Sequence, residues 1–506
     1  MTANIARVGH KCVGAGVLLA VIAAWVLSGH PATSSAASAV SGRAFATAVF
    51  DPYVTDGDRP QVFKRMRTAG ATFVRLTVWW PEVAPVGNTP PVGFQARDPS
   101  SNMYRWGAVD STVRSAIVSG LHPIIYVQGA PSWVQTGQKQ RPSDGPVRPS
   151  PSSLADFASA LATRYSGSYA GLPRVRYWQI WNEPNLSVEL MPQSENGKLV
   201  SPDWYRDMVN AAASVIHAAH SDNVVIAGGL APFGGNLNDP SGAPTPNQER
   251  IHPLTFMRQM LCLSDDPKPK PTCNAKSQFD VWAHHPYTYG GPTHHANDPN
   301  DVSLGDLGEM RILLDAAVAA GHVQSRQKVG FWVTEFSYDS KPADPKGLDP
   351  ALHARWVSEA LYRMWQNGVS VVTWFLLRDQ PFPQEMFQSG LYYRGANGIA
   401  SDKPKPALRA FRFPFVAFQQ NDRSITFWGR TSTSTKKALV VEQKQGSRWR
   451  RLASPQVDRY GIFQGRVTSR SSGSFRARLV SGGESSLPFS LTVPADFRFC
   501  PWGSFC

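Results

Sequence analysis

The stretch from Arg176 to Asn185 reads RYWQIWNEPN and contains the end of a predicted strand. Its aromatic and β-branched residues favour an extended conformation as far as Trp181. Pro184 has no backbone N–H to donate to a neighbouring strand, so we expect the strand to stop before it. The stretch therefore places one carboxylate, Glu183, just beyond a strand end, between an amide side chain and a proline.

A second stretch of the same kind, GFWVTEF, runs from Gly330 to Phe336. Here an apolar strand again ends in a single carboxylate, Glu335, flanked by aromatic residues. Burial of this charge is unfavourable unless partners stabilise the ionised form. Either glutamate alone is weak evidence for a site, but two strand-end glutamates form a pair of the kind that two-carboxylate chemistry requires.

Between residues 43 and 415 short β-rich runs alternate with longer helical stretches such as 152–165, 202–219 and 352–367. This alternation predicts βαβ units and a parallel sheet. Eight strands over this length predict a (β/α)8 TIM barrel with insertions, in which the carboxyl ends of the strands carry the chemistry. The eight predicted strands are Ala44–Phe50, Thr72–Val78, Pro123–Val127, Arg176–Trp181, Val224–Ala227, Asp280–Ala283, Lys328–Thr334 and Ser370–Leu376.

The pattern changes near Phe413, and residues 416–506 are predicted to form a smaller all-β sandwich of short strands separated by Gly/Ser turns. Its predicted strands are Ser424–Trp428, Ala438–Gln443, Ser447–Leu452, Gly461–Thr468 and Ser474–Val480. Residues 412–506 contain 15 Lys/Arg and 5 Asp/Glu, which gives +10 of the chain's net charge of +14. Such a domain suits an anionic cell-wall polymer, and a basic solvated surface fits equally. No nucleic-acid recognition motif is present.

The first 39 residues are typical of an export signal. Arg7 and Lys11 precede an apolar run from Val13 to Leu27, and an A-x-A cleavage site ends at Ala39. The run is short for a membrane span, although an uncleaved N-terminal anchor is the alternative. We therefore expect a secreted, extracellular protein.

Four of the five cysteines follow the signal segment. Four cysteines allow three pairings, and the local one joins Cys262 to Cys273 and Cys500 to Cys506. Disulfides suit an oxidising compartment. A zinc site is the rival interpretation, but no C-x2-C spacing favours it.

These features resemble the clan A glycoside hydrolases, barrel enzymes with the acid/base on strand four and the nucleophile on strand seven. Within the clan, residues 43–415 are similar to families five and thirty-nine. The resemblance implies that Glu183 is the acid/base and Glu335 the nucleophile of a retaining hydrolase. Such an enzyme cleaves O-glycosidic bonds in a poly- or oligosaccharide by double displacement and needs no cofactor.

The resemblance also implies further site residues. Arg75 matches the strand-two arginine beside the nucleophile, and Asn182 matches the amide that binds the sugar 2-hydroxyl. His285 and Tyr287 match a His-x-Tyr motif after strand six, and Trp374 matches a sugar platform on strand eight. Purely structural roles remain open for Arg75, for the His285/Tyr287 pair and for Trp374. Trp79, Trp80 and Trp133 are candidates for extra subsites.

Strand three departs from the pattern, because some clan members end it with a histidine. In this chain His122 precedes the strand and Gln128 follows it. The departure weakens the likeness to family five and leaves the sugar contacts on that side open.

Two rival functions remain. A cluster of histidines and aspartates between residues 284 and 301 suggests a metal-dependent polysaccharide hydrolase, but its spacing is poor and we expect no metal. A wall-associated carbohydrate-binding barrel without activity is the second rival, and the presence of both glutamates argues against it. We expect a monomer. Sugar identity, linkage and endo or exo action do not follow from the sequence.

Overall fold

The structure is a computed structural model, and it describes residues 42–54, 57–137, 139, 143–238, 244–432, 438–469 and 473–492. The predicted export signal and the predicted Cys500–Cys506 pair lie outside these residues. Within the described ranges, no helix has the length and apolar character needed to cross a membrane.

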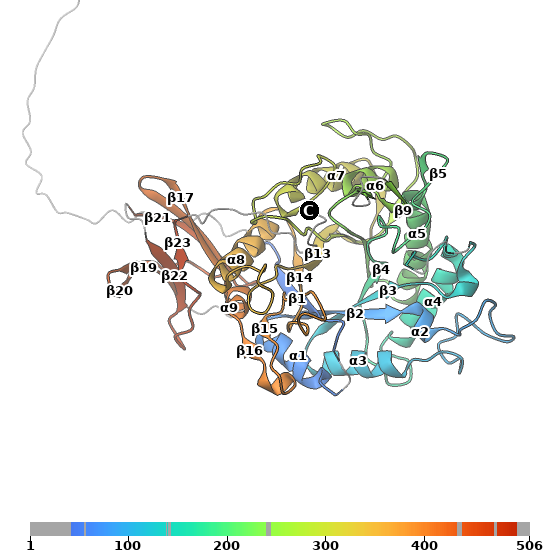
Figure 1. The fold of residues 1–506 in the computed structure, drawn as a ribbon, viewed down its shortest axis with the longest axis horizontal. Helices are drawn as coiled ribbons and strands as arrows, with labels where there is room; N and C mark the ends of the chain where they lie inside the picture. The colour runs from blue at the N-terminus through green and yellow to red at the C-terminus, as the bar shows by residue number, and fades with distance from the viewer. Residues whose placement is uncertain are drawn as a thin grey trace, which may run out of the picture. The chain divides into compact units, whose positions relative to one another are not determined.

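Eight parallel strands close into a barrel, as the sequence predicted (Figure 1). Around the barrel the strands run in the order β1, β2, β3, β4, β7, β11, β13 and β14, and β14 pairs again with β1. Every predicted barrel strand overlaps an observed one. The strands are β1 Ala46–Phe50, β2 Phe73–Trp79, β3 His122–Gln128, β4 Tyr177–Ile180, β7 Val224–Leu230, β11 Val281–His284, β13 Gly330–Phe336 and β14 Val371–Phe375.

Helices follow the strands and pack outside the barrel. Several begin with a proline at the first or second position, where no intrahelical N–H bond is lost. The helices are α1 Arg59–Thr68, α2 Trp80–Val83, α3 Gly107–Val118, α4 Pro151–Arg164, α5 Ser201–Ala219, α6 Pro253–Met260, α7 Leu307–Ala319, α8 Pro350–Gln366 and α9 Pro406–Arg412. Short strand pairs decorate the loops: β5 Ser194–Glu195 with β6 Lys198–Leu199, β8 Gly235–Asn238 with β9 Pro244–Arg250, β10 Ser277–Gln278 with β12 Val323–Gln324, and β15 Tyr392–Tyr393 with β16 Lys403–Pro404.

The barrel interior is filled by side chains in layers. One layer is mainly aliphatic and includes Ile124, Val281 and Val371, and the rings of Phe73 and Tyr177 pack there against Trp332. A separate aromatic layer, which includes Phe50, Tyr126 and Phe375, comes from the last residues or the carboxyl-terminal half of its strands. This second layer forms the apolar floor beneath the strand ends, where buried charges lose the screening of water.

Two antiparallel sheets follow the barrel, in agreement with the predicted sandwich. All five predicted strands are present, and the sequence missed β17 and β23. The rings of Phe418 on β17 and Phe489 on β23 lie 5.8 Å apart and join the sheets. One sheet contains β17 Phe415–Asn421, β18 Ser424–Arg430 and β21 Ile462–Thr468, and the other contains β20 Arg448–Ala453, β19 Leu439–Gln445, β22 Ser474–Leu479 and β23 Phe489–Ser490.

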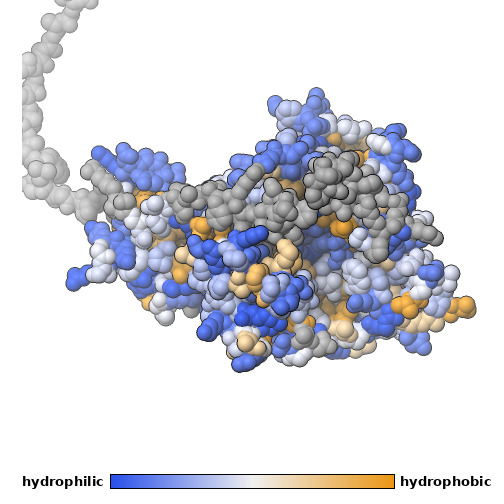
Figure 2. All heavy atoms as spheres, in the orientation of Figure 1, coloured by the Kyte–Doolittle hydropathy of each residue, from blue (hydrophilic) through white to orange (hydrophobic). Residues whose placement is uncertain are grey.

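The C-terminal strands lie beside α8 and α9 (Figure 1). Trp428 packs against Phe45 at the start of the barrel and against Trp365 on α8, with ring centroids 6.1 and 5.5 Å apart. Arg355 on α8 donates to the carbonyl of Ser490 at 2.7 Å. The C-terminal part in Figure 2 shows mostly hydrophilic residues on the visible face. The contact with the barrel thus combines buried aromatic packing with hydrogen bonds from arginines of α8 and α9.

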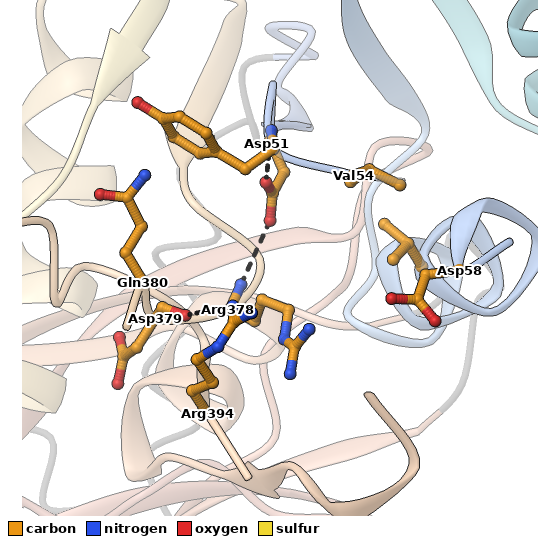
Figure 3. A pocket seen from close by; sticks show the side chains of 9 residues that line it. Asp51, Val54, Asp58, Arg378, Asp379, Gln380 and Arg394 are labelled. Carbon is orange, nitrogen blue, oxygen red and sulfur yellow. Dashed lines mark hydrogen bonds between the residues drawn. The ribbon is translucent and has the colours of Figure 1, made fainter. Parts of the chain in front are cut away.

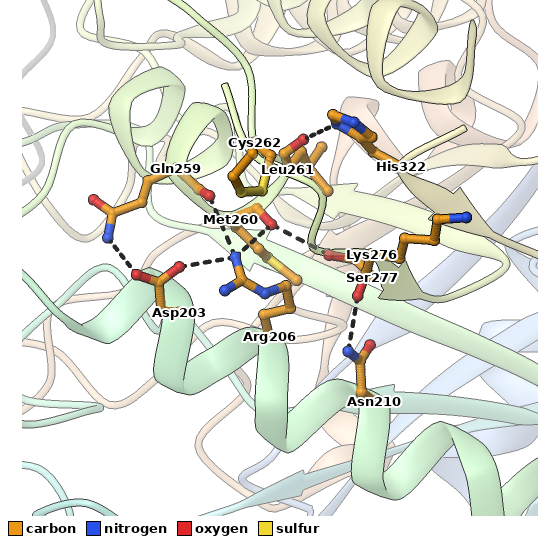
Figure 4. Close-up of a disulfide and its surroundings, with 11 residues drawn as sticks. Asp203, Arg206, Asn210, Gln259, Met260, Leu261, Cys262, Lys276, Ser277 and His322 are labelled. Atoms are coloured by element: carbon orange, nitrogen blue, oxygen red, sulfur yellow. Dashed lines mark hydrogen bonds and ion pairs between the residues drawn. A yellow bond between two sulfur atoms is a disulfide. The ribbon is translucent and has the colours of Figure 1, made fainter. Parts of the chain in front are cut away.

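The predicted disulfide between Cys262 and Cys273 is present, with Cα atoms 5.1 Å apart (Figure 4). It lies after α6 and fixes a surface loop close to the start of α5. Arg206 on α5 donates to the carbonyl of Met260 at 3.1 Å, next to the disulfide. This pairing excludes these two cysteines as zinc ligands.

Candidate active site

The chain bends sharply where β4 ends. Trp181 and Glu183 have φ values of 70° and 41°, a left-handed conformation that costs free energy for residues with a side chain. Neighbouring strand ends hold the bend, since the N–H of Trp181 donates to Val127 and that of Glu183 donates to Gly229, both at 3.0 Å. The bend fixes the direction of the Glu183 side chain between β3 and β7.

Glu335 lies one residue before the end of β13, and each of its carboxylate oxygens accepts a hydrogen bond. Arg75 Nη1 donates to Oε2 at 2.8 Å, and the Tyr287 hydroxyl donates to Oε1 at 2.9 Å. The Glu335 side chain keeps 17% of its surface exposed, so a ligand can reach it. An ionised carboxylate accepts at both oxygens in this way. The arrangement therefore suits a nucleophile.

Arg75, on β2, organises the centre of the site. Besides Glu335, its guanidinium donates to Asn182 Oδ1 at 2.8 Å and to Gln179 Oε1 at 3.1 Å. The guanidinium also lies 3.9 Å from the ring centroid of Tyr126, which adds a cation–π contact. Because the planar guanidinium directs its N–H groups at fixed angles, Arg75 fixes the positions of Glu335 and Asn182 relative to each other.

Glu183 contacts His285, the first residue after β11. His285 Nδ1 lies 2.9 Å from Glu183 Oε1, and its Nε2 lies 3.1 Å from the Thr334 hydroxyl. Burial lowers the pKa of His285 to about 3, so the ring is neutral at ordinary pH. Burial also raises the pKa of Glu183 to about 7, while the positive charges of Arg75 and Arg250 lower it. Glu183 can therefore gain and lose a proton near neutral pH.

The structure thus brings four of the five residues predicted around the two glutamates into one site, namely Arg75, Asn182, His285 and Tyr287, and Trp374 is the exception. The model of the family described as cellulase (glycosyl hydrolase family 5) matches residues 33–375, more than half of the chain. The chain belongs to glycosyl hydrolase family 5. This family lies in clan A, whose enzymes are retaining glycoside hydrolases. The unusual end of strand three is therefore a variation within family 5.

Solved structures similar to this family 5 chain include a family 39 glycoside hydrolase from Bacteroides cellulosilyticus WH2. It has 17% identity and a TM-score of 0.48 over 84% of this chain and 79% of that chain. A family 39 enzyme from Xanthomonas axonopodis pv. citri has 16% identity and a TM-score of 0.46, covering 84% and 92%. A GH5_18 protein from Streptomyces cattleya, in complex with GlcNAc, has 15% identity and a TM-score of 0.45, covering 73% and 79%. No curated protein matches the sequence.

Trp374 does not reach the site of this family 5 barrel, contrary to the prediction that it forms a sugar platform. Its side chain is fully buried, and its indole N–H donates to the carbonyl of Ser389 at 2.9 Å. Its ring packs against Phe411 on α9, outside the barrel. Successive residues of a strand point to opposite sides, so its neighbour Phe375 faces the interior and Trp374 cannot. This is a correction of the prediction.

The other candidate tryptophans divide between the rim and the core. Trp79 ends β2 and is 40% exposed, whereas Trp80 is buried against Phe157 on α4. The indole nitrogen of Trp133 donates to the carbonyl of Pro85 at 2.9 Å, and its ring packs on Trp80. Of these three, Trp79 is the most exposed, and it lies at the carboxyl end of β2, on the catalytic end of the family 5 barrel.

Two charged residues near Glu183 were missed by the sequence. Glu189 accepts a hydrogen bond from Gln128 at 2.7 Å and a long one from Asn182 at 3.4 Å. Arg250 forms a backbone bridge with Leu186, three residues after Glu183. Glu189 lies in the loop after β4, and Arg250 ends the short strand β9 between β7 and α6, so neither follows a barrel strand. One sequence signal pointed to Glu189: strand three ends in Gln128 instead of a histidine, and Gln128 is the residue that donates to Glu189.

The histidine cluster does not form a metal site within the described residues. Its members have separate partners: the carbonyl of Val302 is 2.7 Å from His284 Nε2, and Asp306 is 2.7 Å from His295 Nδ1. Asp301 lies 2.7 Å from His252 rather than beside a clustered histidine.

A second pocket opens where β1 and β14 end (Figure 3). Asp51 accepts hydrogen bonds there from the backbone N–H groups of Leu377 and Arg378. The Arg378 side chain also pairs with Asp402 at 2.8 Å. Neither Glu183 nor Glu335 lines this pocket, so we distinguish it from the catalytic centre.

Proposed function

We propose that this family 5 chain is a secreted, retaining O-glycosidase acting on an oligo- or polysaccharide by double displacement. One observation carries the proposal: two glutamates from β4 and β13 have opposite environments. Glu335 accepts from Arg75 and Tyr287, as an ionised nucleophile does, whereas burial raises the pKa of Glu183 to about 7, as an acid/base requires.

In the first step, Glu335 attacks the anomeric carbon while the glycosidic bond breaks and Glu183 protonates the leaving oxygen. In the second step, Glu183 removes a proton from water, and the water oxygen displaces Glu335 from the sugar. We place the His285 proton on Nδ1, because Thr334 can then donate to Nε2. His285 then donates to Glu183 Oε1 in either state of Glu183 and leaves Oε2 to carry the catalytic proton.

Substrate binding follows from the groups around this pair. Asn182 Oδ1 accepts from Arg75, which turns its two amide N–H bonds away from the arginine; one donates to Glu189 and the other is available to the sugar 2-hydroxyl. The exposed ring of Trp79 offers a flat apolar face to a second sugar unit. These contacts favour a substrate of several units over a simple glycoside.

The roles are tested by Glu183→Ala and Glu335→Ala on aryl glycosides. E183A should slow substrates with poor leaving groups far more than activated ones, and azide should restore turnover to give a glycosyl azide of retained configuration. E335A should abolish both reactions, and azide could then give only an inverted product. A 2-fluoro activated glycoside should label the peptide that contains Glu335.

Glu195→Ala is the matched control, because Glu195 pairs with Arg148 in the β5–β6 hairpin and contacts no proposed site residue. An inverted sugar from the wild-type enzyme, or labelling at another carboxylate, would contradict the assignment. Activity that persists in a chelator excludes the metal-dependent rival, and activity of any kind excludes an inactive binding barrel.

Secretion is supported by the N-terminal apolar segment and by the Cys262–Cys273 disulfide, since disulfides persist in oxidising compartments. We expect a mature chain beginning near Val40 with no free thiol. Intact mass of the secreted protein, before and after alkylation without reduction, checks both expectations. Two or more added labels would contradict the proposed second pair, Cys500 with Cys506.

We further propose that the basic C-terminal sheets bind an anionic wall polymer. The edge strand β20 carries the exposed Arg448, Arg450 and Arg451. Co-sedimentation with insoluble polygalacturonate should occur at low salt and weaken as salt screens the charges. Substitution of all three arginines by glutamine should reduce it, whereas unchanged binding would contradict this surface.

A further inference from the structure

A third carboxyl group, that of Glu189, lies beside the catalytic pair. Its loop is fixed to the bent end of β4, because the Trp181 indole N–H donates to the carbonyl of Glu189 at 2.9 Å. The residue is partly exposed, and its side chain is held at both oxygens: Oε2 accepts from Gln128 at 2.7 Å and Oε1 from Asn182 at 3.4 Å. The carboxyl group is therefore in a defined position beside the catalytic pair.

The neighbours of Glu189 form a row across the site. Gln128 ends β3, Glu189 follows, and then come Asn182 and Arg75, which holds Glu335. With the anomeric carbon between the two catalytic glutamates and the sugar 2-hydroxyl at Asn182, the next ring position lies toward Glu189. That position carries the 3-hydroxyl. The row thus follows the order of carbons 1, 2 and 3 of a sugar ring.

The two residues that hydrogen-bond the Glu189 carboxyl group, Gln128 and Asn182, are both donors and leave it without an acceptor for a proton of its own. Burial, assisted by the negative charge of Glu183, raises the pKa of Glu189 to about 8, so the group is a neutral acid at pH 7. A neutral acid has one O–H to donate. Both of the hydrogen-bonding partners named above, Gln128 and Asn182, are themselves donors to it. A sugar hydroxyl can accept this hydrogen bond.

We propose that Glu189 determines specificity by binding the 3-hydroxyl of the sugar held between Glu183 and Glu335. The inference rests on the proposed function. It assigns the substrate class: the sugar at this position has free hydroxyls at carbons 2 and 3, so chains substituted or branched at carbon 3 of this unit are poor substrates. Glu189 and Gln128 replace the strand-three histidine as the contact on this side.

The test uses the 4-nitrophenyl β-glucoside, β-galactoside or β-xyloside that the wild-type enzyme cleaves fastest, with its 2-deoxy and 3-deoxy analogues. Removing the 3-hydroxyl should lower kcat/KM of the wild type at least tenfold, because a site built around a hydroxyl rejects its absence. In Glu189→Ala this penalty should shrink to about twofold. Glu189→Gln should keep most of the penalty, since the amide N–H replaces the acid O–H.

Glu195→Gln is the control and should show the wild-type penalty. An unchanged 3-deoxy penalty in E189A overturns the proposal, because a merely structural residue would slow parent and analogue equally. The proposal is also overturned if E189A reduces the penalty of the 2-deoxy analogue and leaves that of the 3-deoxy analogue unchanged. Cleavage of the parent glycoside with retained configuration tests the proposed function in the same assay. If the parent is cleaved in this way but E189A keeps the 3-deoxy penalty, only the role of Glu189 is overturned. A wild type that cleaves neither these aryl glycosides nor any oligosaccharide overturns both.

Discussion

At the scale of single residues, opposing influences set the protonation of Glu183. Burial raises its pKa to about 7, and the positive charges of Arg75 and Arg250 act in the other direction. Arg250→Met removes one of these charges, so the pKa of Glu183 should rise further. Because catalysis requires protonated Glu183, the alkaline limb of kcat/KM should move to higher pH, by up to about 1 unit.

The measurement is a pH profile of kcat/KM on an aryl glycoside with a poor leaving group. Arg97→Met is the control, because Arg97 is exposed and pairs with Asp156 away from the site. A downward shift in R250M, or an equal shift in R97M, would be inconsistent with a direct effect of Arg250 on Glu183.

Residues of the site differ in how far the sequence could predict them. Glu183 and Glu335 follow apolar strands, and the end of a parallel strand has a fixed place in a barrel. Glu189 lies in a loop, and Arg250 ends β9, a short strand outside the barrel. Their positions depend on contacts such as the Trp181–Glu189 hydrogen bond, which joins residues with no shared pattern. Local periodicity cannot place such residues.

At the scale of elements, the same limit explains the error at Trp374. Every residue of β14 is buried, because the barrel core covers one face and the helices cover the other. Such a strand has no alternation of polar and apolar residues to show which side chains face inward. The sequence therefore located the strand but did not show which of its alternate residues face the barrel interior. Similarly, β17 was missed because its apolar beginning, Phe415–Phe418, continues the apolar end of the barrel.

The end of β7 depends on a glycine. Gly229 has a φ of 61°, and a Cβ atom there would lie 2.6 Å from Gln179 Nε2. Gln179 in turn accepts from Arg75, which holds Glu335. Gly229→Ala should therefore lower kcat/KM at least tenfold, and the strain should reduce the free energy of unfolding by about 1–3 kcal/mol.

Gly197→Ala separates these two effects. Gly197 has a φ of 74°, but a Cβ atom there has open space within 4 Å. This control should share the backbone strain and keep wild-type kcat/KM. Kinetics and denaturant unfolding of both variants check the argument, and full activity in G229A would show that Gln179 does not position Arg75.

At the scale of the whole molecule, the barrel and the C-terminal sheets share buried surface. The sequence predicted a boundary near Phe415. Every proposed site residue precedes this boundary, so we expect the barrel to be active alone. That boundary remains a prediction, but Trp428 fills an apolar space against Phe45, Tyr362 and Trp365. We expect removal of residues 416–506 to expose this surface and to lower solubility before it changes the catalytic centre.

Trp428→Ala tests this division between stability and chemistry. The side chain is only 2% exposed, so its loss leaves a cavity and should lower the free energy of unfolding by about 3–5 kcal/mol. None of its aromatic neighbours contacts Glu183 or Glu335, so kcat/KM at 25 °C should stay within about twofold of wild type. Trp449→Ala on the edge strand β20, where the ring packs mainly on Arg476, should cost less than about 1 kcal/mol. Denaturant unfolding gives the free energy of unfolding of both variants, and kinetics at 25 °C gives their kcat/KM. Equal stability of W428A and wild type would mean that the sheets do not stabilise the barrel. Lost activity in a folded W428A would mean that the sheets influence the catalytic centre.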